Sequence, residues 1–303
     1  MPHLQSRPNK PALAGALAAL LLPWAAHAVS TVDEHRPASP QGAVEIENVA
    51  GSVDVQGWDK PEVAVSGTIG KDVERLEVTS KGEHTSIRVI LPRGSNGGTR
   101  DGSAHLIIHV PANSSIEASV VSSDFKISAV RGAMELRAVS GNIGGEGGGD
   151  LHINSVSGDI HMTAMSAKEI EVKSVSGEID LTAGNVDIEA STVSGDAHLK
   201  LGTVSRARLK TISGDFSATL AAAANAQIDG ESTSGDFKLD FASAPDADYD
   251  IHTWSGNIDN CFGPKPTESR HGPGSRLAFK TGEGNARVRI RSLSGTVHLC
   301  AGK

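Results

Sequence analysis

Short stretches of alternating apolar and polar residues recur along the chain, each centred on a Ser-Gly pair. Around Gly158, the apolar residues Leu151 and Ile153 precede the glycine and Ile160 and Met162 follow it, with polar residues between them. Alternation with a period of two residues is typical of a half-buried β-strand. Each unit therefore predicts a strand, a corner at the glycine and a second strand.

The unit recurs with a short, regular period. Successive glycines are separated by 17, 19, 18, 19, 21, 21 and 39 residues. Such recurrence indicates a repeat architecture, because one unit cannot bury its apolar face alone. The sequence predicts an all-β fold, a parallel β-helix-like β-solenoid with coils of about 17–21 residues stacked ~4.8 Å apart. The corner glycines, with Gly51 in a looser N-terminal copy, are Gly51, Gly141, Gly158, Gly177, Gly195, Gly214, Gly235, Gly256 and Gly295.

Glycine suits the corner because it accepts a positive φ and has no Cβ to obstruct the coils on either side. The position two residues before the glycine is also apolar, as at Val156, Val175, Val193 and Ile212. We expect these side chains to point inward, with a bulge or corner shifting the phase of the strand.

The chain begins with a segment of different composition. Arg7 and Lys10 precede an apolar run that ends in Ala26-His27-Ala28, a pattern typical of a secretory signal peptide. We expect a signal peptide at 1–28, an extended segment at 29–42 and the solenoid at 43–303, irregular over 43–104 and regular over 105–303. No integral membrane segment is expected after cleavage, so the protein would be exported to the periplasm, the cell surface or the medium.

The net negative charge of the chain narrows the classes of partner that it can bind. Removing the leader takes the formal charge from −8 to −10. An acidic exported protein lacks the basic surface that nucleic acid requires, so no nucleic-acid partner is expected.

Several segments resemble a known family. These are "VEIENVAGSVDVQGWDKPEVAV", "HLIIHVPANSSIEASVVSSDFKI", the serial "VSGDI" units and the closing "TWSGNIDNCFGP…GEGNARVRIRSLSGTVHLC". Together they are similar to the bacterial putative-adhesin family of unknown function, over about residues 43–303. The resemblance implies an exported β-solenoid of the cell envelope, and it supplies no catalytic residues.

The two cysteines occupy the same position of their units. Cys261 lies five residues after Gly256, and Cys300 lies five residues after Gly295. Two full coils between them would separate them by ~9.6 Å, too far for a disulfide. The segment 263–276 is rich in Pro and Gly and is expected to leave the coil, so we predict that Cys261 and Cys300 are bonded on adjacent coils.

An acidic column follows the glycines at Asp159, Glu178, Asp196, Asp215 and Asp236. Carboxylates stacked ~4.8 Å apart repel one another. Hydrogen bonds to turn amides would relieve this repulsion, and Ca²⁺ binding is the alternative.

Two further groups of outward side chains suggest ligands. His161, Asp180 and His198 share one column, which suggests a metal site, although an ordinary solvated ladder has the same pattern. Arg287, Arg289 and Arg291 alternate with apolar residues on one strand. They would either bind a polyanion such as envelope polysaccharide or protect a charged last coil from aggregation.

The sequence shows no signature of a nucleophile, a phosphate loop or a zinc protease. Only 3% of residues are aromatic, which disfavours a sugar-stacking cleft. We therefore expect a non-enzymatic adhesin or envelope scaffold without a cofactor, binding envelope polysaccharide or surface proteins. A carbohydrate-active β-helix enzyme and an envelope-stress component that docks a partner at a sheet edge are the alternatives.

Overall fold

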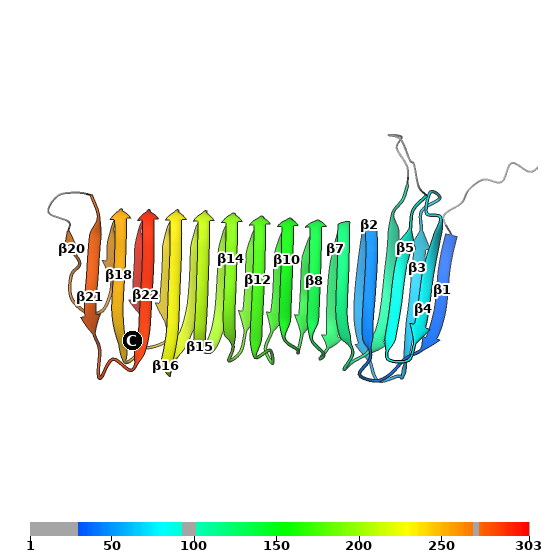
Figure 1. Cartoon of the computed structure of the whole chain (residues 1–303), viewed down its shortest axis with the longest axis horizontal. Helices are drawn as coiled ribbons and strands as arrows, with labels where there is room; N and C mark the ends of the chain where they lie inside the picture. The colour runs from blue at the N-terminus through cyan, green and yellow to red at the C-terminus, as the bar shows by residue number, and fades with distance from the viewer. Residues whose placement is uncertain (1–29, 93–100, 269–272, 303) are drawn as a thin grey trace, which may run out of the picture.

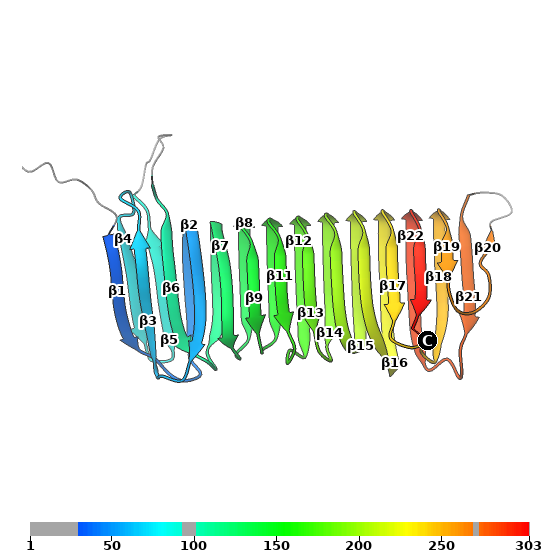
Figure 2. The ribbon, with the colours of Figure 1, turned by 180° about the vertical axis from the view of Figure 1, so that it is seen from behind.

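Residues 30–92, 101–268 and 273–302 are described here from a computed structural model. The expected signal peptide lies outside these residues, and it stays a prediction. The described chain is all-β, with 23 strands and no helix. Figures 1 and 2 show the strands side by side along one long axis, as a β-solenoid requires.

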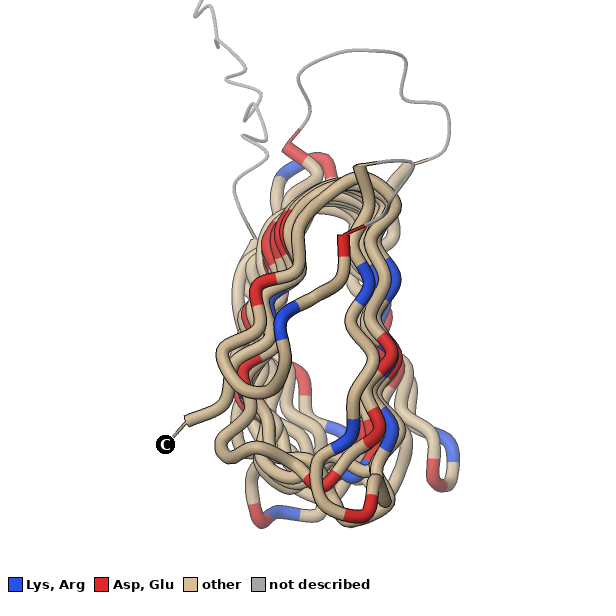
Figure 3. The backbone as a smooth tube through the Cα atoms, turned by 90° about the vertical axis from the view of Figure 1, so that its left-hand side faces the viewer, with Lys and Arg blue, Asp and Glu red and all other residues tan. Residues whose placement is uncertain are grey.

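The regular part of the solenoid contributes one strand before each corner and one after it. Its strands are β7 (Ser115–Val130), β8 (Met134–Ser140), β9 (Ile143–Gly147), β10 (Leu151–Ser157), β11 (Ile160–Ala164), β12 (Glu169–Ser176), β13 (Ile179–Ala183), β14 (Asp187–Ser194), β15 (Ala197–Ser213), β16 (Phe216–Ser234) and β17 (Phe237–Phe241). β10 pairs in parallel with β8 and β12, and β11 pairs in parallel with β9 and β13. We call the strands before the corner the front sheet and those after it the back sheet; Figure 3 shows them as the two long sides of a flattened coil.

The core lies between the two sheets and is built from aliphatic columns. Leu151, Ile153, Ile160 and Met162 are at most 2% exposed. Equivalent residues stack in register, as Ile153 does with its partners on β8 and β12. The alternation read from the sequence is therefore confirmed, and so is the β-solenoid.

The apolar position two residues before each glycine points outward, so the expected inward placement is wrong. Val156 is 48% exposed, whereas its neighbour Ser155 is 4% exposed. The alternation continues to the corner without a phase shift. In the later units the inward hydroxyl bonds to a corner carbonyl, as the Thr253 hydroxyl does by donating to the Gly256 oxygen at 2.8 Å. The buried hydroxyls of Ser155, Ser174 and Thr192 have no hydrogen-bond partner among the described residues.

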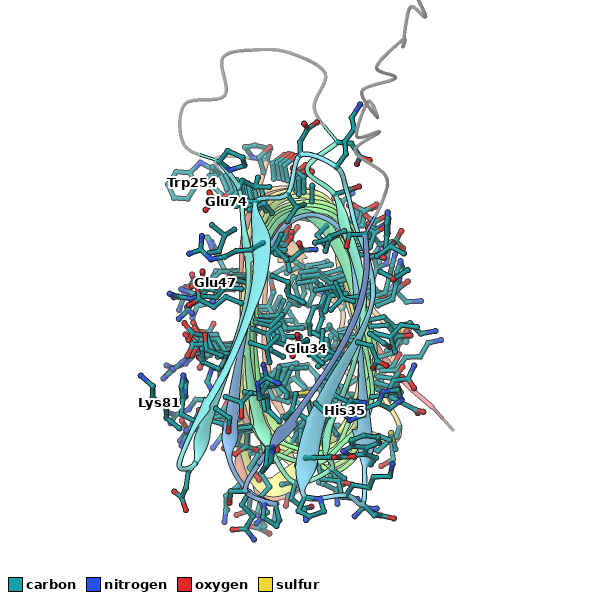
Figure 4. All side chains as sticks on the ribbon, turned by 90° about the vertical axis from the view of Figure 1, so that its right-hand side faces the viewer. Glu34, His35, Glu47, Glu74, Lys81 and Trp254 are labelled. Carbon is teal, nitrogen blue, oxygen red and sulfur yellow. A yellow bond between two sulfur atoms is a disulfide. The ribbon has the colours of Figure 1, made fainter. Side chains whose placement is uncertain are left out.

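The N-terminal part is less regular. Its strands are β1 (Ser30–Pro37), β2 (Ala43–Trp58), β3 (Glu62–Ile69), β4 (Arg75–Lys81), β5 (His84–Ile90) and β6 (Ala104–Pro111). β2 joins the parallel stack through β5, β6 and β7, whereas the β1–β3, β3–β6 and β4–β5 pairs are antiparallel. Figure 4 looks onto this end and shows side chains filling the space between the sheets.

The C-terminal coils are stacked out of sequence order. Their strands are β18 (Ala247–Ser255), β19 (Ile258–Asn260), β20 (Thr267–Glu268), β21 (Ser275–Lys280), β22 (Ala286–Ser294) and β23 (Val297–Ala301). β22 lies between β16 and β18 (Figure 1). Likewise, β23 lies between β17 and β19. β21 returns antiparallel along the outer edge of β18. The last coil in sequence therefore fills a slot inside the stack, and the expectation that it ends the stack is wrong.

This insertion brings the two cysteines together. Cys261 and Cys300 form a disulfide with their Cα atoms 4.8 Å apart. Beside it, Tyr249 stacks on Phe279 with ring centroids 4.5 Å apart, and Phe262 packs edge-on against Tyr249. The disulfide ties the end coil to the inserted coil, and the aromatic cluster packs β18 against the edge strand β21.

Candidate functional site

The corner glycines stack in one column, which Ser123 interrupts between Gly51 and Gly141. Eight of the nine glycines singled out from the sequence have φ between 108° and 150°; Gly256 is the exception. A Cβ built on Gly177 would lie 2.3 Å from the carbonyl oxygen of Gly158, and one on Gly256 would lie 2.0 Å from that of Gly295. A side chain at Gly177 or Gly256 would therefore collide with the neighbouring coil.

The acidic column is used to hold the corners together. Oδ1 of Asp159 accepts the backbone N–H of Glu178 at 3.0 Å. Asp196, Asp215 and Asp236 each accept the N–H of the equivalent residue on the next coil, at 2.8–2.9 Å. These carboxylates thus satisfy turn amides, which is the alternative to Ca²⁺ binding considered for this column.

The three residues of the candidate metal column do not converge. His161 Nδ1 lies 3.0 Å from Asp180 Oδ2. His198 is directed instead to Glu178, with Nε2 3.6 Å from Oε1. Within residues 30–92, 101–268 and 273–302, no three His, Cys, Asp or Glu side chains are grouped so that they could hold a metal ion.

The arginine triad, Arg287, Arg289 and Arg291, lies between two acidic strands. Arg289 is opposite Asp229 on β16 and opposite Asp250 on β18. The Arg291 guanidinium is 3.5 Å from the Asp250 carboxylate. Acidic and basic positions are interspersed along the coils in Figure 3. The triad is therefore part of a mixed-charge ladder inside the stack.

A row of exposed apolar side chains runs along the front sheet, next to the corners. We call it the apolar ridge. It contains one residue from each of ten stacked strands, namely Val49, Val121, Val139, Val156, Val175, Val193, Ile212, Thr233, Leu293 and Trp254. The nine apolar members are 36–69% exposed.

A polar column runs beside the ridge, two residues nearer the start of each strand. We call it the flanking column, and in stacking order it contains Glu47, Ser119, Arg137, Asn154, Lys173, Ser191, Lys210, Glu231, Arg291 and His252. Short side chains alternate with long ones from Ser119 to Ser191. Between this part of the column and the ridge lies an open groove of about 790 Å³.

The long side chains of the flanking column are held by neighbouring carboxylates. Arg137 Nη1 is 3.0 Å from Glu117 Oε1, and its other terminal nitrogen contacts Glu135. Lys173 donates a hydrogen bond to Glu171, and this bond lowers the pKa of the Glu171 carboxyl. The walls of the groove thus carry positive charge without being strongly basic.

The sequence pattern revealed the ridge residues but placed them on the wrong side of the sheet. The sequence did contain a signal for the outward direction, namely whether the distance along the strand from an inward residue is odd or even. Val156 is an odd number of positions from the inward residues Leu151 and Ile153, so strict alternation places it outside. The outward direction makes this row an accessible surface.

Comparisons with known proteins give one matching family and several solved structures of low similarity. Proteins of curated function include none with significant sequence similarity. Two crystal structures named putative adhesin, from Parabacteroides distasonis and Bacteroides fragilis, are both 12% identical, with TM-scores of 0.49 and 0.45. Each alignment covers 89% of this chain and 97% of the other. A putative lipid binding protein from P. distasonis is 15% identical with a TM-score of 0.42, covering 90% and 97%.

The described residues contain no helix that could cross a membrane. A sequence model of the Toastrack DUF4097 family matches residues 44–300, which is most of the chain. The protein therefore belongs to the Toastrack DUF4097 family.

Proposed function

We propose that this protein is an exported, non-enzymatic β-solenoid that acts as an adhesin or scaffold of the cell envelope and binds partners through the apolar ridge. The observation that carries the proposal is the unbroken line of outward apolar side chains from Val49 to Ile212. Contiguous apolar surface of more than a few hundred Å² marks interaction sites on soluble proteins. A row of this length is suited to an extended partner surface.

The energy available from the ridge is sufficient for association. Fully burying an aliphatic side chain is worth about 1.5–3 kcal/mol, so a half-exposed one gains about half of that on complete burial. Nine such side chains give roughly 7–14 kcal/mol before the cost of association, which is about 4–15 kcal/mol. The ridge can therefore support weak to moderate binding by itself, and flanking contacts would set the specificity.

The carboxylates of the corner column are less suited to catalysis. They accept backbone N–H groups across the coils, so they are held as structural acceptors. A second open groove, of about 750 Å³, contains the exposed Trp254. Glu268 is the single carboxylate among the described residues that line it, whereas a glycosidase uses two, about 5–9 Å apart. These features favour binding over sugar hydrolysis.

Docking by strand addition has less support than docking on the ridge. β19, at the C-terminal edge of the back sheet, has three residues. β1, at the N-terminal end, carries charged side chains from Asp33 to Arg36 and ends in Pro37. Short, charged and Pro-containing edges resist pairing with another chain. An envelope-stress component that docks a strand therefore remains a weaker alternative.

The proposal is tested by capture from envelope fractions with the mature protein, residues 29–303. We expect the variant Val139→Thr/Val156→Thr/Val175→Thr/Val193→Thr to lose the captured material, because threonine keeps the β-branched shape but removes apolar surface. Ile107→Thr is the control, since Ile107 is 42% exposed and outside the ridge. Equal capture by wild type and ridge variant would refute the proposal.

Polyanion binding by the arginine triad is a separate candidate. Its acidic neighbours reduce the field available to an anionic polysaccharide. One variant changes all three arginines to glutamine, and a control variant removes Lys126, Lys200 and Lys238 of the back sheet. We expect immobilised heparin to retain the two variants equally. Selective loss in the triad variant would show instead that the triad binds polyanions.

A further inference from the structure

We propose that the apolar ridge and the flanking column pair with the same surface of a second copy of the protein. The two solenoids would lie with antiparallel axes, related by a two-fold axis that passes between β12 and β14 and runs along the strands. This inference rests on the proposed function, because it names the partner of the same ridge. Two-fold contacts use one patch twice, so the patch must complement itself.

The ridge meets these demands in shape. Its ten strands are in register, and a row at the ~4.8 Å strand spacing matches another stacked row of the same spacing. Figure 4 labels Glu47 of β2 and Trp254 of β18, from opposite ends of the row, on the same long side of the coil. Under the two-fold, Val175 faces Val193, Val156 faces Ile212, and the small end residue Val49 faces the large Trp254.

The flanking column is complementary in size under the same two-fold. Each short side chain of one half meets a long one from the other half of the second copy. These pairs are Ser119 with Arg291, Asn154 with Lys210, and Ser191 with Lys173. The groove of about 790 Å³ lies along the half with the short side chains. Long side chains of the second copy would fill it.

Charge selects this register over its neighbours. In the full-overlap register Arg137 faces Glu231 and Glu47 faces His252, so the ten positions of the flanking column contain no like-charged pair. If one protein slides by one coil in one direction, Arg137 faces Lys210, and Lys173 faces Lys173 of the second copy. A slide in the other direction places Arg137 on Arg291 and Lys173 on Lys210. Both slides create two kinds of like-charged contact and lose one coil of overlap.

The next column outward limits the width of the contact. Across the same two-fold it would bring Glu171 near Glu189 and Glu135 near Asp229. Glu171 is already hydrogen-bonded to Lys173, and Glu189 is 3.6 Å from Arg208. At the two ends of the stack the flanking column itself continues to Arg88 on β5, opposite Glu47, and to Arg276 on β21, opposite His252. The two-fold would bring these two like charges together, and each is paired with its own carboxylates. These groups stay at a solvated rim, and the interface is confined to two columns.

The size of this strip predicts a reversible dimer. Ten strands at ~4.8 Å spacing extend ~43 Å, and two columns with their side chains are ~14 Å wide. The strip would bury ~600 Å² on each copy, ~1,200 Å² in total, at the lower limit for specific interfaces. We therefore expect a dimer that dissociates on dilution.

The experiment measures sedimentation velocity of the mature protein from about 1 µM to about 500 µM. We expect a monomer–dimer equilibrium that Arg137→Glu weakens at least tenfold. The double variant Arg137→Glu/Glu231→Arg should recover most of the lost affinity, because it restores the opposite charges in trans. Lys126→Glu, on the back sheet, is the control for charge reversal. A protein that is monomeric throughout, or a double variant no better than the single one, would overturn the proposal.

The register is tested by mixing two differently tagged single-cysteine variants. Val175→Cys and Val193→Cys should cross-link with each other in preference to themselves, because the two-fold places these positions opposite each other. Preferential Val175→Cys self-linking would overturn the register. If the protein does not dimerise but envelope capture still depends on the ridge, this inference alone is refuted. If it dimerises but captures no envelope material, the proposed function alone is refuted.

Discussion

Replacing Gly177 by alanine tests whether the corners are stacked as tightly as the structure indicates. Gly177 has a φ of 121°, and its Cβ would lie 2.3 Å from the carbonyl oxygen of Gly158. Real Cβ atoms do not approach a backbone oxygen so closely, and no rotamer change can move a backbone atom away. The neighbouring coils must separate at the corner.

The expected loss of stability follows from two terms. A non-glycine residue forced into such a conformation costs about 1–3 kcal/mol. Separation of the coils weakens the 2.8 Å bond from Ile160 N–H to the Glu178 carbonyl and the 3.0 Å bond from Glu178 N–H to Asp159. Each is worth about 1 kcal/mol. We expect Gly177→Ala to lower the free energy of unfolding by about 3–5 kcal/mol.

Gly82 is a matched control for this experiment. It also has a positive φ, of 61°, but a Cβ there would meet no atom within 4 Å. Gly82→Ala should therefore cost only the conformational strain, about 1–2 kcal/mol. Urea unfolding followed by circular dichroism gives both values, and hydrogen exchange around residues 158–196 tests whether the loss is local. Equal shifts of the two midpoints would refute the stacking argument.

Three further predictions concern stability. Cys300→Ser should lower the free energy of unfolding by about 3–4 kcal/mol, because the disulfide closes a 39-residue loop, and it should speed hydrogen exchange in β19 and β23; unchanged exchange would contradict this. Asp196→Ala should cost about 1–2 kcal/mol in thermal unfolding by removing the acceptor of the Asp215 N–H, and Asp196→Asn should restore most of it. Burial raises the pKa of Tyr249 to about 12, from about 10 in the unfolded chain. The neutral phenol therefore makes its full contribution to the free energy of unfolding below pH 10, and this contribution declines as the pH rises towards 12. Tyr249→Phe should remove that decline, and an unaltered alkaline profile would count against it.

The features that repeat locally could be predicted from the sequence. Apolar residues at Ile160 and Met162, with polar residues beside them, specify a strand whichever coil it pairs with. A glycine at a fixed place in each unit specifies a corner, and like corners stack in register. The same reasoning placed Cys261 and Cys300 in one column, and they form the disulfide.

The order of the C-terminal coils could not be predicted from these patterns. The units at Gly235, Gly256 and Gly295 are alike in their columns, so either order buries the same kinds of side chain. The 39-residue interval is compatible with an excursion, and it leaves open where the chain returns. The structure places the last unit between the other two, with β21 covering the outer edge. The pairing of β22 with both β16 and β18 is long-range, and the repeated pattern does not specify it.

Neither strand propensity nor packing in the core explains why the outward positions of the ridge are apolar. If the outward position needed only a β-branched residue, threonine would serve, and Thr233 shows that the fold accepts it there. The other nine positions are apolar and exposed in the single chain. The exposed half of a valine side chain gains nothing over threonine in water, but it gains when a partner covers it. This difference is the reason why we propose that a partner covers the ridge, and the straight row and constant spacing of the ridge suit another solenoid.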